Sequence, residues 1–311
     1  MRILLLRWAA PATLLVCAAL GTFTTTPSAG ETFQTRGTDQ TVTVRLGDRE
    51  LLRYQHAPRP FKPYVHSWYT PEGRQVLRDA PADHLHHHGL MFAVGADGVN
   101  FWEEPAQAGK QVPVGGPRIT SRSENDRLTA TISQELQWQN AEGDPLMLES
   151  RKVTLRPNSL PNASLLEWET RLEPAEGQSP LELWGRNYFG LGLRMVASMD
   201  QEGEFRNAEG DPGEAATGSQ RIHRGVWCAY TAHIDDHPVT IAMFDHPDNP
   251  RPVSWFTMTA PFAYLSATLG LDQERLSLTE GQVLQLRYAV IAWDGRPSEE
   301  EIAAAYQAWL P

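Results

Sequence analysis

Short segments of alternating apolar and polar residues, separated by turn residues, run along almost the whole chain, and they limit its fold more than any other feature. Thr41–Leu46 alternates, Gly47 and Asp48 make a turn, and residues 51–54 return, which predicts a β-hairpin. In residues 164–172, apolar or uncharged residues alternate with two glutamates and an arginine. Because side chains alternate across a strand, this pattern is typical of a sheet with one face in water.

Only the C-terminus has a helical pattern. Ser298 precedes three glutamates, and Ile302, Tyr306 and Trp309 follow at helical spacing. The rest of the chain shows no internal repeat, linker or low-complexity break. The sequence therefore predicts an all-β fold, a large antiparallel β-sandwich with a short C-terminal helix, in one domain that spans residues 31–311.

Residues 1–30 have the pattern of a secretory signal peptide. Arg2 and Arg7 supply positive charge, residues 9–20 are apolar, and small residues follow as far as Gly30. An N-terminal membrane anchor is the alternative, but the apolar run is short for a span. We expect cleavage near Ala29 or Gly30 and export to the periplasm or the extracellular space.

The charge and cysteine content narrow the range of partners. The formal net charge of −11 disfavours nucleic acid and anionic membrane surfaces. After signal cleavage only Cys228 remains, so an internal disulfide is excluded and the core must hold the domain together. Cys228 lies in an apolar run, and we interpret it as a buried thiol. We expect a small-molecule or glycan ligand and no transmembrane span after cleavage.

Residues 83–90 concentrate the chemistry of the chain, with one aspartate and four of its ten histidines. The apolar residues 90–94 that follow predict a buried strand. If the extended conformation reaches back into the histidines, His84, His86 and His88 point to one side, and Asp83 and His87 to the other.

Three interpretations of these histidines stay open. They can form a hydrogen-bonded set without chemistry. His84, His86 or His88 can bind a divalent metal such as Zn, Cu or Fe together with a distant carboxylate. His86 or His87 can exchange a proton with a substrate, because histidine titrates near neutral pH.

Polar residues elsewhere are candidates for the same site. Glu103 and Glu104 follow Trp102, which suggests a base beside a stacking platform, although a solvated strand end explains them equally. Arg194 ends an apolar strand and is either a substrate anchor or a buried ion-pair partner. Three further candidates lie in loops, where turn chemistry is the alternative explanation: Asn207, Glu209 and His246.

Several of these motifs occur in an order that resembles a known family. The motifs are Lys62-Pro63-Tyr64, residues 83–95, residues 98–104, residues 206–210 and residues 244–250. Together they resemble the bacterial PmoA-like family, also called "methane oxygenase PmoA", over essentially the whole mature chain. His88 and Leu85 depart from its pattern, in which Arg and Pro are common. The resemblance implies a fold similar to the β-supersandwich of sugar mutarotases. It does not imply methane oxidation, because the membrane subunit of that name is built from transmembrane helices.

The sequence favours a secreted carbohydrate-active enzyme, either a hydrolase, a lyase or an epimerase. In this hypothesis His86 or His87 exchanges a proton, Glu103 or Glu209 is its partner, and Arg194 holds the substrate. Substrate contacts are expected from Trp102, Arg194, Asn207 and His246. The alternatives are a non-catalytic glycan-binding protein and a metal-dependent oxidoreductase.

Overall fold

The computed structural model describes residues 33–57, 61–124 and 127–311. These residues fall within one compact unit. The predicted signal peptide, with Cys17, lies outside them. Among the described residues, no helix is long and apolar enough to cross a bilayer.

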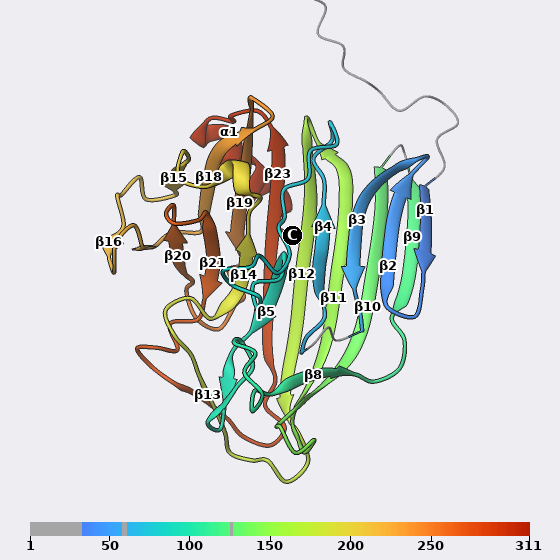
Figure 1. Cartoon of the computed structure of the whole chain (residues 1–311), viewed down its shortest axis with the longest axis vertical. Coiled ribbons are helices and arrows are strands. Elements are labelled where there is room, and N and C mark those ends of the chain that lie inside the picture. The colour runs from blue at the N-terminus through green and yellow to red at the C-terminus, as the bar shows by residue number, and fades with distance from the viewer. Residues whose placement is uncertain (1–32, 58–60, 125–126) are drawn as a thin grey trace, which may run out of the picture. The chain divides into compact units, whose positions relative to one another are not determined.

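A ten-stranded sheet and a nine-stranded sheet make up most of the fold (Figure 1). In spatial order, the first contains β1 (Phe33–Gly37), β2 (Thr41–Leu46), β3 (Arg49–Gln55), β4 (Tyr64–Trp68), β5 (Leu90–Ala93), β14 (Gly190–Arg194), β21 (Tyr264–Thr268), β20 (Ser254–Met258), β17 (Arg221–His223) and β16 (Glu214–Ala215). The second contains β15 (Glu204–Asn207), β18 (Trp227–Ile234), β19 (His237–Asp245), β23 (Leu284–Asp294), β12 (Ala163–Pro174), β11 (Pro145–Leu160), β10 (Arg127–Gln139) and β8 (Lys110–Pro113), and β9 (Arg118–Glu124) also pairs with β10.

Smaller elements complete the chain. A four-stranded sheet contains β22 (Leu276–Leu278), β13 (Leu181–Trp184), β6 (Gly95–Ala96) and β7 (Val99–Asn100), and a 3-10 helix covers Ala197–Met199. Helix α1 (Glu299–Trp309) ends the fold. The strands pair antiparallel. The all-β sandwich prediction with a short C-terminal helix is confirmed.

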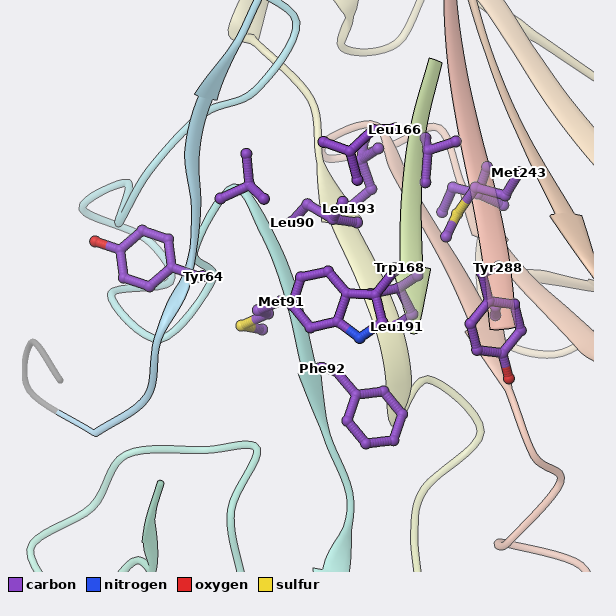
Figure 2. Close-up of a cluster of buried hydrophobic side chains, with 14 of the residues drawn as sticks. Tyr64, Leu90, Met91, Phe92, Leu166, Trp168, Leu191, Leu193, Met243 and Tyr288 are labelled. Atoms are coloured by element: carbon purple, nitrogen blue, oxygen red, sulfur yellow. The ribbon is translucent and has the colours of Figure 1, made fainter. Parts of the chain in front are cut away.

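The core lies between the two large sheets because alternate residues of facing strands point inward. Figure 2 shows Trp168 of β12 packed among Leu90, Phe92 and Leu193 of the ten-stranded sheet. Trp68 Nε1 donates to the Ser164 hydroxyl across the gap, at 3.0 Å. Residues of opposite parity on β4, β5 and β14 therefore lie on the other side of the ten-stranded sheet, which we call the outer face.

Helix α1 packs on the nine-stranded sheet, away from this core. Its buried residues Ile302, Ala305 and Tyr306 join Phe244 and Ile291 in a second apolar cluster. The helix begins with a capping box, in which the Ser298 side chain accepts from the N–H of Glu301 at 3.2 Å. Asn207, which the sequence suggested to be in a loop, ends strand β15.

Candidate active site

The histidine segment is a pair of turns and not the start of a strand. The N–H of His84 donates to the Pro81 carbonyl at 2.9 Å, and the N–H of His87 donates to the His84 carbonyl at 3.0 Å. Strand β5 begins only at Leu90. The predicted alternation of the histidines is therefore wrong, because turn hydrogen bonds set the direction of each side chain. We call residues 80–89 the turn segment.

Three of the four histidines contact one another on the outer face. The ring centre of His87 lies 4.6 Å from those of His84 and His86. His87 also lies 5.1 Å from Tyr264 of β21. Burial, with the neighbouring positive groups, lowers the pKa of His87 to about 2. Its imidazole is therefore neutral at working pH and can make hydrogen bonds, but a proton carrier needs a pKa nearer neutrality.

His86 is half-buried, like His84, whereas His87 is buried. Burial, together with the charges of Lys62 and His84, lowers its pKa, while Glu104 and Glu103 act in the opposite direction. At neutral pH it is therefore an uncharged imidazole, the form that accepts a proton. The same interactions place both glutamates within electrostatic range of His86.

The fourth histidine faces a separate buried network. His88 Nδ1 lies 2.8 Å from Asp79 Oδ1, and His88 Nε2 lies 3.1 Å from Glu104 Oε1. The ammonium of Lys62, which is fully buried, donates to the same Glu104 oxygen at 2.5 Å. The ring of Tyr64 stacks on His88 with a centroid separation of 4.4 Å.

The charges of this network stabilise one another. Burial acts to lower the pKa of His88, but its hydrogen bonds with Asp79 and Glu104 outweigh burial and raise it. Burial acts to raise the pKa of Glu104, whereas His88 and Lys62 lower it. Burial lowers the pKa of Lys62 in spite of Glu104. Glu104 thus contacts two buried cationic groups, Lys62 and His88.

Glu103 points away from Glu104 and lies nearer to solvent. It accepts from Asn100 Nδ2 at 2.9 Å and from the Tyr188 hydroxyl at 3.2 Å, and Arg186 Nη1 lies 3.1 Å away. Its side chain is 28% exposed, so it is an accessible carboxylate at the site.

Trp102 does not form the exposed stacking platform that the sequence suggested. It is fully buried and stacks on Phe189 at 5.3 Å. Its ring lies over Gly192 of β14, where a Cβ atom would come within 2.6 Å of the indole. Tyr188, which is half-buried and bonded to Glu103, is the aromatic ring nearer to solvent.

Arg194 lies on the outer face, opposite Tyr264 in the β14–β21 register. Its guanidinium carbon is 3.4 Å from the ring centre of Phe262, and Nη2 is 3.5 Å from Asp83 Oδ2. The side chain is buried, and Asp83 of the turn segment is one of its neighbours. The structure therefore brings Arg194 together with the histidines, as the sequence hypothesis requires.

The structure does not bring the three candidate metal ligands together. Among the described residues, no three His, Cys, Asp or Glu side chains come together as metal ligands. His88 faces Asp79 and Glu104, while His84 and His86 pack together elsewhere.

Three other candidates lie in different places. Asn207 Nδ2 bonds to His223 Nδ1 at 2.9 Å, and its Oδ1 accepts from the N–H of Glu209 in a turn. His246 borders a cavity of about 170 Å³ beside Trp309. In the part of the chain that the structure describes, no hydrogen bond, ion pair or ring contact joins Glu209, Asn207 or His246 to the histidine cluster. The sequence hypothesis grouped residues that the fold separates.

Sequence reasoning also missed residues that the fold brings to the site. They are Asp79, Tyr188, Phe262 and Tyr264, and Lys62 was noted only as part of a motif. Asp79 precedes His88 by 9 residues, but nothing in the sequence marks it as a partner. Tyr188, Phe262 and Tyr264 are far from the histidines in the sequence, and the pairing of β5 with β14 and of β14 with β21 brings them near.

A family pattern matches residues 41–307. The chain belongs to this family, DUF6807, whose function is unknown. The resemblance to the PmoA-like family is therefore wrong, since the match over nearly the whole described chain is to DUF6807. No curated protein matches this DUF6807 chain.

Solved structures share the fold. The α-galactosidase AgaB of glycoside hydrolase family 36 from Geobacillus stearothermophilus matches with a TM-score of 0.50 and 13% identity, over 84% of this chain and 41% of its own. A galactose mutarotase related enzyme from Lactobacillus acidophilus matches with a TM-score of 0.37 and 9% identity, over 86% of this chain and 100% of its own. This chain thus spans about two fifths of the α-galactosidase. At this identity the likeness to the α-galactosidase concerns the fold alone.

Proposed function

We propose that this DUF6807 protein is a carbohydrate-active enzyme that transfers protons at the outer face of its ten-stranded sheet. The observation that carries the proposal is the placement of half-buried His86, whose ring packs against those of His84 and His87, within range of the charges of Glu103 and Glu104. Accessible Glu103 is held by Tyr188 and Arg186, so it can accept hydrogen bonds from substrate hydroxyls. The carbohydrate-related fold supports this substrate class by analogy.

In the proposed mechanism, His86 is the general base. Its lowered pKa keeps the imidazole free to accept a proton at neutral pH. Glu103 orients the sugar. The charges of the buried Lys62–Glu104–His88 network set the electrostatic field at the site. His87 stays neutral and packs the base in place.

The test is a turnover assay with a panel of mono- and oligosaccharides. His86→Gln should lower kcat by about 100-fold to 10,000-fold, as expected for loss of acid–base catalysis. Glu103→Gln should raise KM, because the charged acceptor that orients the sugar is lost. His233→Gln, at an exposed position of β18, is the matched control and should retain activity. Full activity of His86→Gln would exclude the mechanism. Sugar binding without turnover by the wild type would instead identify a glycan-binding protein.

We also propose that the protein is exported. The basic and apolar pattern of residues 1–30 supports export. Expression of the full chain, followed by cell fractionation and N-terminal sequencing, tests it. A processed N-terminus near Ala29 or Gly30 in the exported fraction is expected, and an intact chain retained in the cytoplasm would contradict the proposal.

A further inference from the structure

Buried polar groups without a partner gather at one place on the outer face. They are Nε and Nη1 of Arg194, the Tyr264 hydroxyl, Nε1 of Trp102 and Nδ1 of His87, none of which has a hydrogen-bond partner among the described residues. The four residues are 1%, 2%, 0% and 7% exposed, in that order. Native proteins pair most buried polar groups, so several orphaned groups in one place need an explanation.

Contacts between neighbouring side chains join these groups into one patch. Arg194 and Tyr264 are direct partners across β14 and β21. The ring of Tyr264 lies 5.1 Å from His87 and 6.3 Å from Trp102. The Tyr264 hydroxyl and the Trp102 ring both occupy the space that a side chain at Gly192 would need. A side chain at position 192 would fill the patch, which explains the glycine there.

The chemistry of the patch is that of an anion site. A guanidinium and an indole N–H can only donate, and a phenol hydroxyl can donate. Donors arranged beside a buried cation match a carboxylate, which accepts two parallel bonds from arginine. The charges of Asp200 and Asp83 both act on Arg194. Asp83 of the turn segment lies 3.5 Å from Nη2, without a hydrogen bond to it. Asp83 is about half exposed, so it neutralises the arginine only weakly.

We propose that the ligand of this site is a sugar acid, such as a hexuronic acid unit, whose carboxylate binds Arg194 and accepts from Tyr264 and Trp102. This inference rests on the proposed function, which it deepens by naming the substrate class. The donor atoms of Arg194, Tyr264 and Trp102 are buried. The ligand carboxylate therefore reaches them only when the turn segment moves and Asp83 leaves Arg194.

Calorimetric titration at fixed ionic strength tests the inference. The probes are D-glucuronate and D-galacturonate, their neutral counterparts glucose and galactose, and acetate and inorganic phosphate. Wild-type protein should bind a uronate at least about 10-fold more tightly than the neutral sugar, since a hydrogen-bonded charge pair is worth that much. Arg194→Gln should abolish the preference, whereas Arg156→Gln, on the other sheet, should leave it unchanged.

Three further variants keep the test decisive if Arg194→Gln does not fold. Tyr264→Phe removes a hydroxyl that has no partner among the described residues, so it should weaken uronate binding without lowering Tm. Tyr230→Phe, which loses a bond to the Met199 carbonyl, should lower Tm and leave binding unchanged. Asp83→Asn removes the competing anion and should tighten uronate binding.

The outcomes separate this inference from the proposed function. Equal binding of uronates and neutral sugars, unaffected by Tyr264→Phe and Asp83→Asn, would overturn the inference and leave a sugar enzyme standing. Acetate or phosphate binding as tightly as the uronates would also overturn it, because the sugar would then contribute nothing. Uronate preference with full turnover by His86→Gln would support the carboxylate site and remove the proposed base.

Discussion

At the scale of single residues, adjacent histidines have opposite environments. His87 packs among aromatic rings, and burial lowers its pKa to about 2. His88, the next residue, lies between two carboxylates that raise its pKa against the effect of burial. The sequence identified both as titratable, but it could not assign the two roles because the direction of each ring depends on turn geometry and on residues far along the chain.

The first prediction concerns the pH dependence of His88. Its folded-state pKa is raised above the ordinary value of 6.5, so its contribution to the free energy of unfolding is complete below pH 6.5. That contribution is lost as pH rises through the folded-state pKa. His88→Gln should therefore cost about 1–3 kcal/mol in mildly acidic solution and less in alkaline solution.

Urea unfolding of wild type and His88→Gln at several pH values checks this prediction. The difference between the two proteins isolates the histidine, because the other titrating groups are shared. His233→Gln should show a small difference at every pH, since its side chain is exposed. A difference for His88→Gln that grows with rising pH would contradict the assigned ion pairs.

At the scale of strands, local patterns located many elements but not their neighbours. The predicted strand Thr41–Leu46 is β2, and its predicted hairpin partner is β3. The order β5, β14, β21 could not be predicted, because these strands are separated by about 70 residues or more of chain. The alternation of apolar and polar residues predicts a strand but does not specify which strands pair. That order creates the site, by placing Arg194 and Tyr264 beside the turn segment.

The second prediction concerns the glycine that joins the turn segment to β5. A Cβ atom on Gly89 would overlap the backbone carbonyl oxygen of Val65, so β4 and β5 would have to separate. Gly89→Ala should destabilise the protein by about 1–3 kcal/mol, as overpacking does. It should also weaken ligand binding, because His88 and the start of β5 move together.

Gly116→Ala is the matched control, since a Cβ atom there meets nothing within 4 Å. Thermal and urea unfolding of both variants compare a blocked with an open position. Equal stability of the two would show that the approach of β4 to the turn segment is not required for the fold.

At the scale of the whole molecule, the sequence predicted the β-sandwich but not which residues converge at the site. Alternation and turn spacing predicted the sandwich, and the structure confirms it. The candidate site came out only in part, because Arg194 meets the histidines, whereas Glu209 and His246 have no contact with them among the described residues. Which distant residues come together depends on how the strands pair, and a single sequence does not specify that pairing.

Polar groups buried between the two large sheets connect the core to the site. Arg151 of β11 is 1% exposed and donates to both carboxylate oxygens of Glu149, from Nε and Nη2 at 2.8 Å each. Its Nη1 reaches the Pro63 carbonyl, next to Lys62, at 2.9 Å, and its Nη2 reaches Gln111 Oε1 at 2.8 Å. Arg151 therefore anchors the segment that carries Lys62 from the opposite sheet.

The third prediction follows from this anchor. Arg151→Gln leaves Glu149 as an uncompensated buried charge and should cost about 3–5 kcal/mol. Lys152→Gln is the matched control. The Lys152 side chain is exposed and lies 3.8 Å from partly exposed Glu169, and such a pair is worth about 0–1 kcal/mol. Urea unfolding separates the two, and equal destabilisation would mean that the buried pair does not hold the sheets together.

Replacing both partners distinguishes stability from positioning. Arg151→Met with Glu149→Leu removes the charges together, so the free energy of unfolding should stay within about 1–4 kcal/mol of wild type and can rise. The bond to the Pro63 carbonyl is still lost, so Lys62 and Glu104 should shift and ligand affinity should fall although the protein is folded. If affinity is unchanged in this double variant, the ion pair serves stability alone, and the site is positioned by the outer face of the ten-stranded sheet.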